Sequence, residues 1–240
     1  GGYAFTLALQ RSQAELERAR VEVDALQKSL EQREEAIRRE QQSSSAREEA
    51  MAGLLAELNR CYPQCWTFFI DGWGGATPEL LVRRSGAHVF ARVLAGTVKR
   101  SADDIIDVDL AVRLQESDKD LAEHEYAVRS VADVLAAHCT DLDVPQQPSL
   151  LQLMNVQHLA TDVAGELADD VPAVVLAGSL HPTAAVCGTP TERAAAVIAE
   201  LEHLDRGRYA APVGWSDARG DGEYGIALRC GHILDSDRQS

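Results

Sequence analysis

The sequence lacks the long apolar run that a membrane-spanning helix needs. No stretch of apolar residues approaches the roughly 20 positions required to cross a bilayer. Residues 1–9 contain an apolar patch, but they have no basic region and no cleavage-site pattern, so we predict no signal peptide. We therefore expect no membrane partner.

Positive charge is also scarce. The chain has 23 lysines and arginines against 38 aspartates and glutamates, which gives a net charge of −15. Such a charge repels polyphosphate at long range, so we expect no nucleic-acid partner. If the substrate is an anion, its site must carry local cations or a metal.

Cysteines are few and do not form a regular pattern. The five are odd in number and scattered, and only Cys61 and Cys65 lie close together. This usage favours reduced thiols in a cytoplasmic protein over a disulfide framework. Cys61 and Cys65 have the spacing of the first half of a zinc site, but no second pair of Cys or His follows at metal-ligand spacing.

Residues 1–50 differ in composition from the rest of the chain and predict a long amphipathic helix of coiled-coil character. Apolar residues recur every seven positions at Leu9, Leu16, Val23, Leu30 and Ile37. In a coiled coil, a second set of positions joins these in the seam that contacts the partner helix. Here that set is Ser12, Ala19, Leu26, Arg33 and Glu40, so the seam is only half apolar. Packing on the chain's own domain and helix-mediated self-association fit it equally well. A polar break is expected at 41–45, followed by a short helix at 51–59.

Residues 51–240 form the second predicted domain, in which helices and strands alternate. With 45% hydrophobic residues overall, a sizeable core is expected. Strands are predicted at 66–70, 88–94, 150–163, 212–216 and 223–229, and helices at 105–114, 121–138, 171–180 and 191–204. Gly72, Gly74 and Gly75 predict a turn between the first two strands. The interleaving indicates a mixed α/β layer architecture.

Several blocks in this domain combine uncommon residue types in a fixed order. They are Gly75-Ala-Thr-Pro-Glu79, Leu94-Ala-Gly-Thr97, Ser117-Asp-Lys-Asp120 with Glu123-His-Glu125, Asn155-Val-Gln-His-Leu-Ala-Thr161, His181-Pro-Thr183 with Gly188-Thr-Pro190, Tyr209-Ala-Ala-Pro-Val-Gly-Trp215, Gly220-Asp-Gly-Glu223 and Ile226-Ala-Leu-Arg229. Each block is weak alone. Together, in this order and spacing, they resemble the core of isochorismate synthases, which belong to the chorismate-utilising enzyme superfamily.

The resemblance runs from about Leu54 to Cys230. The blocks His181-Pro-Thr183 and Gly188-Thr-Pro190 look like isochorismate synthases and differ from anthranilate and aminodeoxychorismate synthases, in which the corresponding stretch reads proline-alanine-glycine-threonine. The resemblance implies that 51–240 is a chorismate-binding domain. Its fold would be an α/β layered sandwich, part of the family fold, behind a long N-terminal helix.

The resemblance also implies a magnesium-dependent conversion of chorismate to isochorismate for menaquinone or siderophore biosynthesis. Water adds at C2 of the ring while the 4-hydroxyl departs, and the family's acid falls on Glu79. Hydroxide is a poor leaving group, and a glutamate can protonate it only if burial or nearby carboxylates raise the pKa of the glutamate. From composition alone, Glu79 is a solvated carboxylate at the start of a strand.

Further site residues follow from the same resemblance. Glu123 matches the family's first magnesium ligand, and a hard cation of this kind needs only one or two carboxylates beside the substrate. His158 matches an active-site histidine beside the ring, although a histidine in an apolar strand is more often a core residue. Arg229 matches the arginine that holds a substrate carboxylate. Other substrate-binding positions are Gly96, Thr97, Thr183, Ala184, Ala185 and Tyr209.

Two parts of the family pattern have no counterpart. The family's base is a lysine in a strand upstream of Leu54, where this chain has the helical stretch Gln32 to Arg38. The family's second metal glutamate and a late lysine are expected after Cys230, where residues 231–240 are polar. Two alternatives therefore remain open: a salicylate synthase, which shares most of these blocks and adds pyruvate elimination, and a noncatalytic truncated relative that acts through its N-terminal helix.

Overall fold

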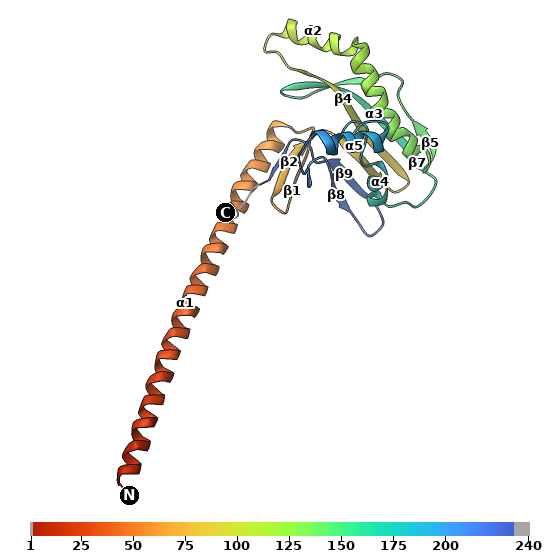
Figure 1. Cartoon of the computed structure of the whole chain (residues 1–240). Coiled ribbons are helices and arrows are strands. Elements are labelled where there is room, and N and C mark those ends of the chain that lie inside the picture. The colour runs from red at the N-terminus through yellow and green to blue at the C-terminus, as the bar shows by residue number, and fades with distance from the viewer. Residues whose placement is uncertain (1, 233–240) are drawn as a thin grey trace. The chain divides into compact units, whose positions relative to one another are not determined.

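A computed structural model of the chain describes residues 2–232, and within the first helix it describes the side chains of residues 20, 24–46 and 48–61 (Figure 1). The chain divides into two compact units, Gly1–Gly53 and Leu54–Ser240. None of the helices described is long and apolar enough to cross a membrane.

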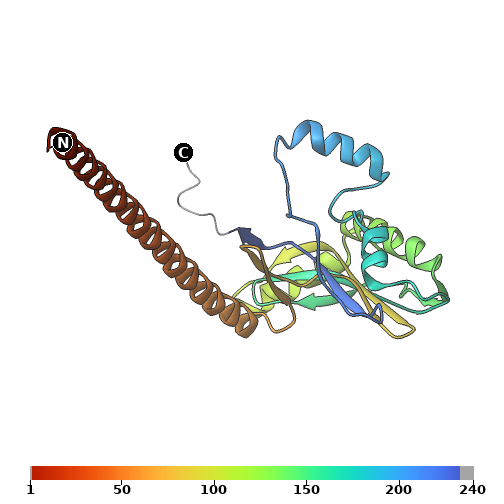
Figure 2. The same ribbon diagram turned by 90° about the horizontal axis from the view of Figure 1, so that it is seen from below.

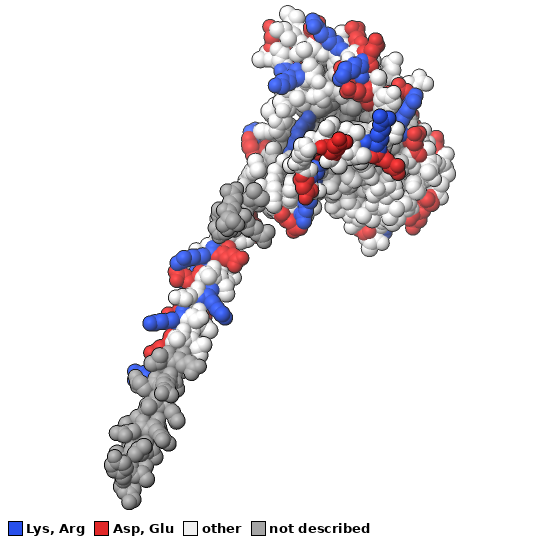
Figure 3. Space-filling model, in the orientation of Figure 1, with Lys and Arg blue, Asp and Glu red and all other residues white. Residues whose placement is uncertain are grey.

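The long helix predicted for the start of the chain is present as α1, Gly2–Cys61. It is continuous, so the predicted break at 41–45 is wrong. Glutamine is a good helix former and serine costs only a few tenths of a kcal/mol per residue, and neither glycine nor proline interrupts the segment. Acidic and basic side chains are interspersed along the described part of α1 (Figure 3). The seam residues Leu26, Leu30 and Ile37 are exposed, and self-association of this helix stays a prediction.

The second unit contains two antiparallel sheets. A three-stranded sheet has the order β1-β2-β10, and a seven-stranded sheet has the order β5-β7-β4-β3-β9-β8, with β6 also paired to β7. The small sheet comprises β1 Trp66–Ile70, β2 Trp73–Thr77 and β10 Cys230–His232. The large sheet comprises β3 Leu80–Ser85, β4 His88–Lys99, β5 Cys139–Asp143, β6 Ser149–Gln152, β7 Val156–Leu167, β8 Pro212–Ser216 and β9 Gly222–Ile226.

Four helices follow or interrupt the strands of the large sheet. They are α2 Asp104–Gln115, α3 Asp118–Ala136, α4 Ala173–Leu180 and α5 Thr191–Leu201. Two of them, α3 and α4, complete the core of the sheet. α3 and α4 lie side by side against the strands (Figures 1 and 2). Alternate residues of β4, Val89, Ala91 and Val93, pack against Leu135 of α3 and Leu176 of α4 in one apolar cluster. α5 contributes no buried residue and stands apart from the sheet in Figure 2.

The predicted mixed α/β class is confirmed, but one predicted turn is wrong. Gly74 and Gly75 lie inside strand β2 instead of forming a turn. A Cβ on Gly75 would approach the backbone oxygen of Arg229 to 2.7 Å and the Cα of Cys230 to 2.8 Å. Glycine is therefore required by the close passage of β10, a contact between segments far apart in the sequence. Strands β3, β5 and β10 were not predicted either.

The core position Leu135 gives a test of this packing. Leu135 is fully buried, whereas Leu201 at the end of α5 is 68% exposed. We expect Leu135→Ala to lower the free energy of unfolding by about 2–5 kcal/mol, because it leaves a cavity under α3. Leu201→Ala should change it by less than about 0.5 kcal/mol. Chemical denaturation measures both, and equal effects would contradict the described core.

Candidate active site

A cavity of about 550 Å³ lies where the β2–β3 connection, the end of β4, the first half of α3 and the link between β9 and β10 meet. Its walls bring together residues that are up to 151 positions apart in the sequence, from Pro78 to Arg229. The lining residues are Pro78, Glu79, Leu94, Ala95, Gly96, Thr97, Glu123, Tyr126, His158, Ala184, Ala185, Gly188, Thr189, Leu228 and Arg229. The four residues on which the predicted site depended, Glu79, Glu123, His158 and Arg229, therefore share one cavity.

Glu79 is buried in the wall of this cavity, between β2 and β3. Its backbone is held on both sides: its N–H donates to the Thr77 hydroxyl at 3.3 Å, and its carbonyl accepts from the Ile226 N–H at 3.2 Å. The residue as a whole is 6% exposed. Burial raises the pKa of Glu79 from 4.5 to about 8, and the positive charge of Arg229 opposes this shift without cancelling it. Glu79 is therefore mostly protonated at neutral pH and is able to donate a proton.

A chain of hydrogen bonds joins Arg229, His158 and Thr97 across the cavity. An Arg229 guanidinium nitrogen lies 2.9 Å from His158 Nε2, and His158 Nδ1 lies 2.8 Å from the Thr97 hydroxyl. Burial, then the charge of Arg229, lowers the pKa of His158 to about 4, so the ring is neutral at neutral pH. Because a guanidinium only donates, Nε2 must accept, and the proton of the neutral ring is on Nδ1.

This tautomer fixes what the three side chains offer to a ligand. The Thr97 oxygen accepts from His158 Nδ1–H, so the Thr97 hydroxyl hydrogen is left to donate elsewhere in the cavity. Both ring nitrogens of His158 are occupied, so in this arrangement the ring orients its neighbours and has no free lone pair for proton transfer. Arg229 supplies a cation at the cavity wall, as an anionic ligand requires in a chain of net charge −15.

Glu123 reaches the cavity because α3 is held in a fixed rotation. The next residue, His124, is buried on the other side of the helix, where its Nδ1 lies 3.0 Å from the Ala95 carbonyl and its Nε2 lies 2.8 Å from the Thr161 hydroxyl. Burial lowers the pKa of His124, so the ring is neutral. Its Nδ1–H donates to the carbonyl of β4, and its Nε2 accepts from the threonine of β7. Successive residues differ by 100° around a helix, so this anchor turns Glu123 toward the cavity.

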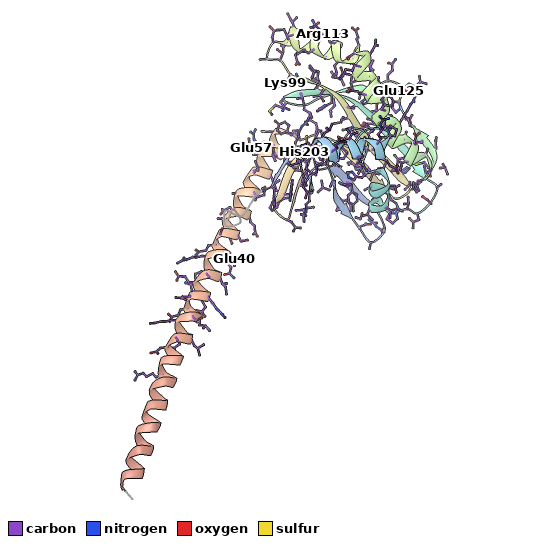
Figure 4. All side chains as sticks on the ribbon, in the orientation of Figure 1. Glu40, Glu57, Lys99, Arg113, Glu125 and His203 are labelled. Carbon is purple, nitrogen blue, oxygen red and sulfur yellow. The ribbon has the colours of Figure 1, made fainter. Side chains whose placement is uncertain are left out.

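Two neighbours of Glu123 were not predicted as site residues. Lys119, one turn earlier, places its Nζ 2.9 Å from a carboxylate oxygen of Glu123. Tyr126, one turn later, lines the cavity. Both lie three or four residues from Glu123, so helical periodicity was the signal that would have found them. Glu125, labelled in Figure 4, pairs with Arg129 outside the cavity.

Some predicted substrate-binding positions are placed differently from expectation. Ala184 and Ala185 line the cavity, but the Ala184 N–H already donates to the Ser130 hydroxyl at 3.2 Å. Thr183 is buried beside the cavity wall, and its hydroxyl has no hydrogen-bond partner among the described residues. Tyr209 does not line this cavity and instead borders a separate hollow next to α5. The Ala184 N–H is therefore not free to bind a ligand.

Gly96 occupies a bulge in β4 at the centre of the site. Leu94 is paired with Ala160 and Thr97 with His158, so two residues of β4 stand opposite one residue of β7. Gly96 has a φ of +82°, and a Cβ there would approach the Leu159 side chain to 3.1 Å. The left-handed φ favours glycine at this position, and an added Cβ would also crowd the Leu159 side chain.

The oxygen donors at the cavity match a magnesium ion only in part. Glu123 places a carboxylate, a hard oxygen donor, on the wall, and Glu79 is protonated at neutral pH. Among the side chains that the structure describes, no group of three His, Cys, Asp or Glu is arranged to hold a metal. Magnesium retains several waters and often takes one or two protein carboxylates with an anionic substrate, so Glu123 fits as one ligand of a shared site.

Comparison with known proteins shows which family and which relatives the chain is similar to. The family described as "Chorismate binding enzyme" matches residues 20–239. The isochorismate synthase DhbC of Bacillus subtilis is 46% identical over 157 residues, which are 65% of this chain and 39% of that protein.

Solved structures agree with the sequence comparison. The structure of DhbC from Bacillus anthracis superposes with a TM-score of 0.72 at 40% identity, over 75% of this chain and 51% of that one. The menaquinone-specific isochorismate synthase MenF of Escherichia coli superposes with a TM-score of 0.68 at 32% identity, over 76% and 43%. This chain thus spans about half the length of the relatives it matches, or less.

The raised pKa of Glu79 predicts how stability depends on pH. The unfolded chain loses this proton near pH 4.5, whereas the folded chain keeps it up to about pH 8. Between these values the wild-type protein loses stability as pH rises, by at most about 1.4 kcal/mol per pH unit from this group. Glu79→Gln removes the titration, so its melting temperature relative to wild type should increase from pH 5 to pH 8. A difference that does not change with pH would contradict the buried, protonated state of Glu79.

Proposed function

Because the chain belongs to the chorismate binding enzyme family, we propose that its 550 Å³ cavity binds chorismate. We also propose that the cavity provides the proton donor of an isochorismate synthase reaction. The observation that supports this most directly is the protonated Glu79 beside the cation Arg229. A proton donor next to a carboxylate-binding group is the arrangement needed to expel a hydroxyl group from an anionic ring.

The properties of the cavity are suited to a small cyclic dianion. Its volume lies within the range of about 300–1,000 Å³ that is usual for small-molecule sites. Arg229 can hold a carboxylate through two parallel hydrogen bonds. The free hydroxyl hydrogen of Thr97 adds a neutral donor close to it, and His158 fixes the orientation of both groups.

In the proposed reaction, Glu79 gives its proton to the 4-hydroxyl of the ring, which leaves as water as the C4–O bond breaks. A second water forms a bond to C2 and releases one proton, so the overall change is an isomerisation. Among the described residues, no lysine lines the cavity to accept that proton. The described residues therefore supply the acid, the carboxylate clamp and a metal ligand, and they do not supply the family's base.

We further propose that Glu123 contributes one ligand to magnesium, shared with a substrate carboxylate and waters. A bound magnesium ion would neutralise charge on the substrate carboxylate. Lys119, paired with Glu123, would have to give way or share that carboxylate. DhbC relatives and a menaquinone-specific relative both match this chain, so the proposal concerns the step they share, the formation of isochorismate.

Chorismate binding without turnover is the second candidate function. It is favoured by one observation: the cavity wall has no lysine among the described residues. The two candidates differ in one measurable way, since only the first converts chorismate.

Incubation with chorismate and magnesium, followed by chromatography, tests for conversion. If the chain forms isochorismate, Glu79→Gln should reduce the rate by about 10²–10⁴-fold, because a positioned acid contributes this much. Glu125→Gln is the matched control, since Glu125 lies outside the cavity, and it should retain the wild-type rate. Turnover that persists in Glu79→Gln would rule out Glu79 as the acid. If wild type forms no product but chorismate raises its melting temperature, the binding function is supported.

Binding itself is tested at Arg229. We expect Arg229→Ala to abolish most of the rise in melting temperature that chorismate causes, because the clamp on the carboxylate is lost. Arg229→Lys should recover only part of it, since lysine keeps the charge but not the paired donors. Arg129→Ala, on the exposed side of α3, is the control and should bind as wild type does. An unchanged shift in Arg229→Ala would exclude the carboxylate clamp.

A further inference from the structure

A buried ionic network lies at the end of β4, just beyond the bulge that contains Gly96. Its centre is Asp107 of α2, a helix that packs against both β4 and β7 (Figure 1). Asp107 is 6% exposed. The Arg100 Nε donates to both carboxylate oxygens of Asp107, at 2.8 and 3.0 Å, and the Ser101 N–H donates to one of them at 2.8 Å. None of these three residues lines the candidate active site.

The same carboxylate also binds β7, through Gln157. This glutamine is fully buried, and its Nε2 donates to a carboxylate oxygen of Asp107 at 3.1 Å and to the Asp107 carbonyl at 3.2 Å. Arg100, which directly follows β4, also donates from Nη1 to the Leu153 carbonyl at 3.0 Å. Asp107 therefore ties the residue that follows β4 to a residue inside β7.

The part of the ladder that follows the bulge is short. It consists of three pairs: Thr97 with His158, Val98 with Gln157 and Lys99 with Val156. Backbone hydrogen bonding would also permit a ladder shifted by one residue, which removes the bulge. Hydrophobic burial selects poorly between the two, because none of the three β4 residues is buried. The shift would turn Thr97 to the other face of the sheet, away from His158.

The network around Asp107 distinguishes the two registers. A shift of one residue moves Arg100 by about 3.3 Å along β7 and turns its side chain to the opposite face, whereas Gln157 stays where it is. One carboxylate could then no longer bind both partners. On the other side of the bulge, His124 already holds the Ala95 carbonyl at 3.0 Å.

We propose that Asp107 is a positioning residue for the candidate active site. By binding Arg100 and Gln157 together, it fixes the register in which the Thr97 hydroxyl lies 2.8 Å from His158 Nδ1. Asp107 does not line the cavity and acts only through this register. The inference rests on the hydrogen bonds of the network and does not depend on the reaction proposed for the cavity.

The test compares Asp107→Asn with Asp162→Asn in the full 240-residue chain. Asp162 of β7 is a matched control because it forms an ion pair with Arg92 of β4, at 2.7 and 2.8 Å, between the same two strands. This pair lies before the bulge. Both variants therefore weaken an arginine–carboxylate pair, but only Asp107→Asn removes the tie beyond the bulge.

Nuclear Overhauser contacts between the strands report the register, and a general loss of stability does not change which residues face each other. In wild type and in Asp162→Asn we expect a contact between Val98 and Gln157. In Asp107→Asn we expect a contact between Val98 and Val156 in its place.

Gln157→Met is the second variant, and circular dichroism establishes whether each variant is folded. It removes the amide that binds Asp107 and leaves the pair between Arg100 and Asp107 intact. We expect the same contact between Val98 and Val156 as in Asp107→Asn.

Chorismate affinity is a separate measurement, which depends on the proposed function. Asp107→Asn should weaken binding about 10-fold or more, because the Thr97 hydroxyl is withdrawn and one hydrogen bond to an anionic ligand is lost. Asp162→Asn should bind as wild type does. If wild type does not bind chorismate, the proposed function fails, while the register measurement still decides the role of Asp107.

An unchanged register in a folded Asp107→Asn or Gln157→Met would overturn the proposal. A shifted register in Asp162→Asn would also overturn it, since any ion pair between the strands would then have the same effect. If neither Asp107→Asn nor Gln157→Met folds, the network maintains the whole fold and Asp107 has no specific positioning role. A shifted register with wild-type chorismate affinity would show that the register does not matter to the site.

Discussion

A single extra residue in β4 is the constraint on which the site depends. With Leu94 opposite Ala160, a regular ladder would place Gly96 opposite His158, but the bulge advances the register so that Thr97 takes that position. The same bulge presents the Ala95 carbonyl to His124, which anchors α3 and turns Glu123 to the cavity. One extra residue thus positions Thr97 of β4, His158 of β7 and Glu123 of α3 around the same cavity.

Competition between burial and charge then determines the chemistry of the cavity. Arg229 favours the ionised form of Glu79, but removal of the carboxyl group from water has the larger effect, and the pKa of Glu79 rises to about 8. The same two causes act together on His158, where burial and the positive neighbour both lower the pKa, to about 4. One cation therefore stands between a protonated carboxyl group and a neutral imidazole, both formally uncharged at neutral pH.

The sequence was informative where local rules decide the structure. Asp103 and Ser117 cap α2 and α3 with their side chains, and the helices begin within a few residues of the predicted positions. It was misleading at Gly74 and Gly75, because glycine-rich segments suggest turns, and only the passage of β10 explains glycine inside β2. The predicted break at 41–45 is wrong for a related reason: serine and glutamine weaken a helix only slightly and do not end α1.

By itself, the sequence determined a long N-terminal helix, an α/β domain and a set of residues that resemble one family's site, because periodicity, capping and the order of motifs are properties of neighbouring residues. Only the tertiary structure decided that Glu79 is protonated, that His158 is neutral with both nitrogens occupied, and that Tyr209 lies away from the cavity. Protonation depends on burial and on the distance to charges from other strands, and no local pattern encodes those distances.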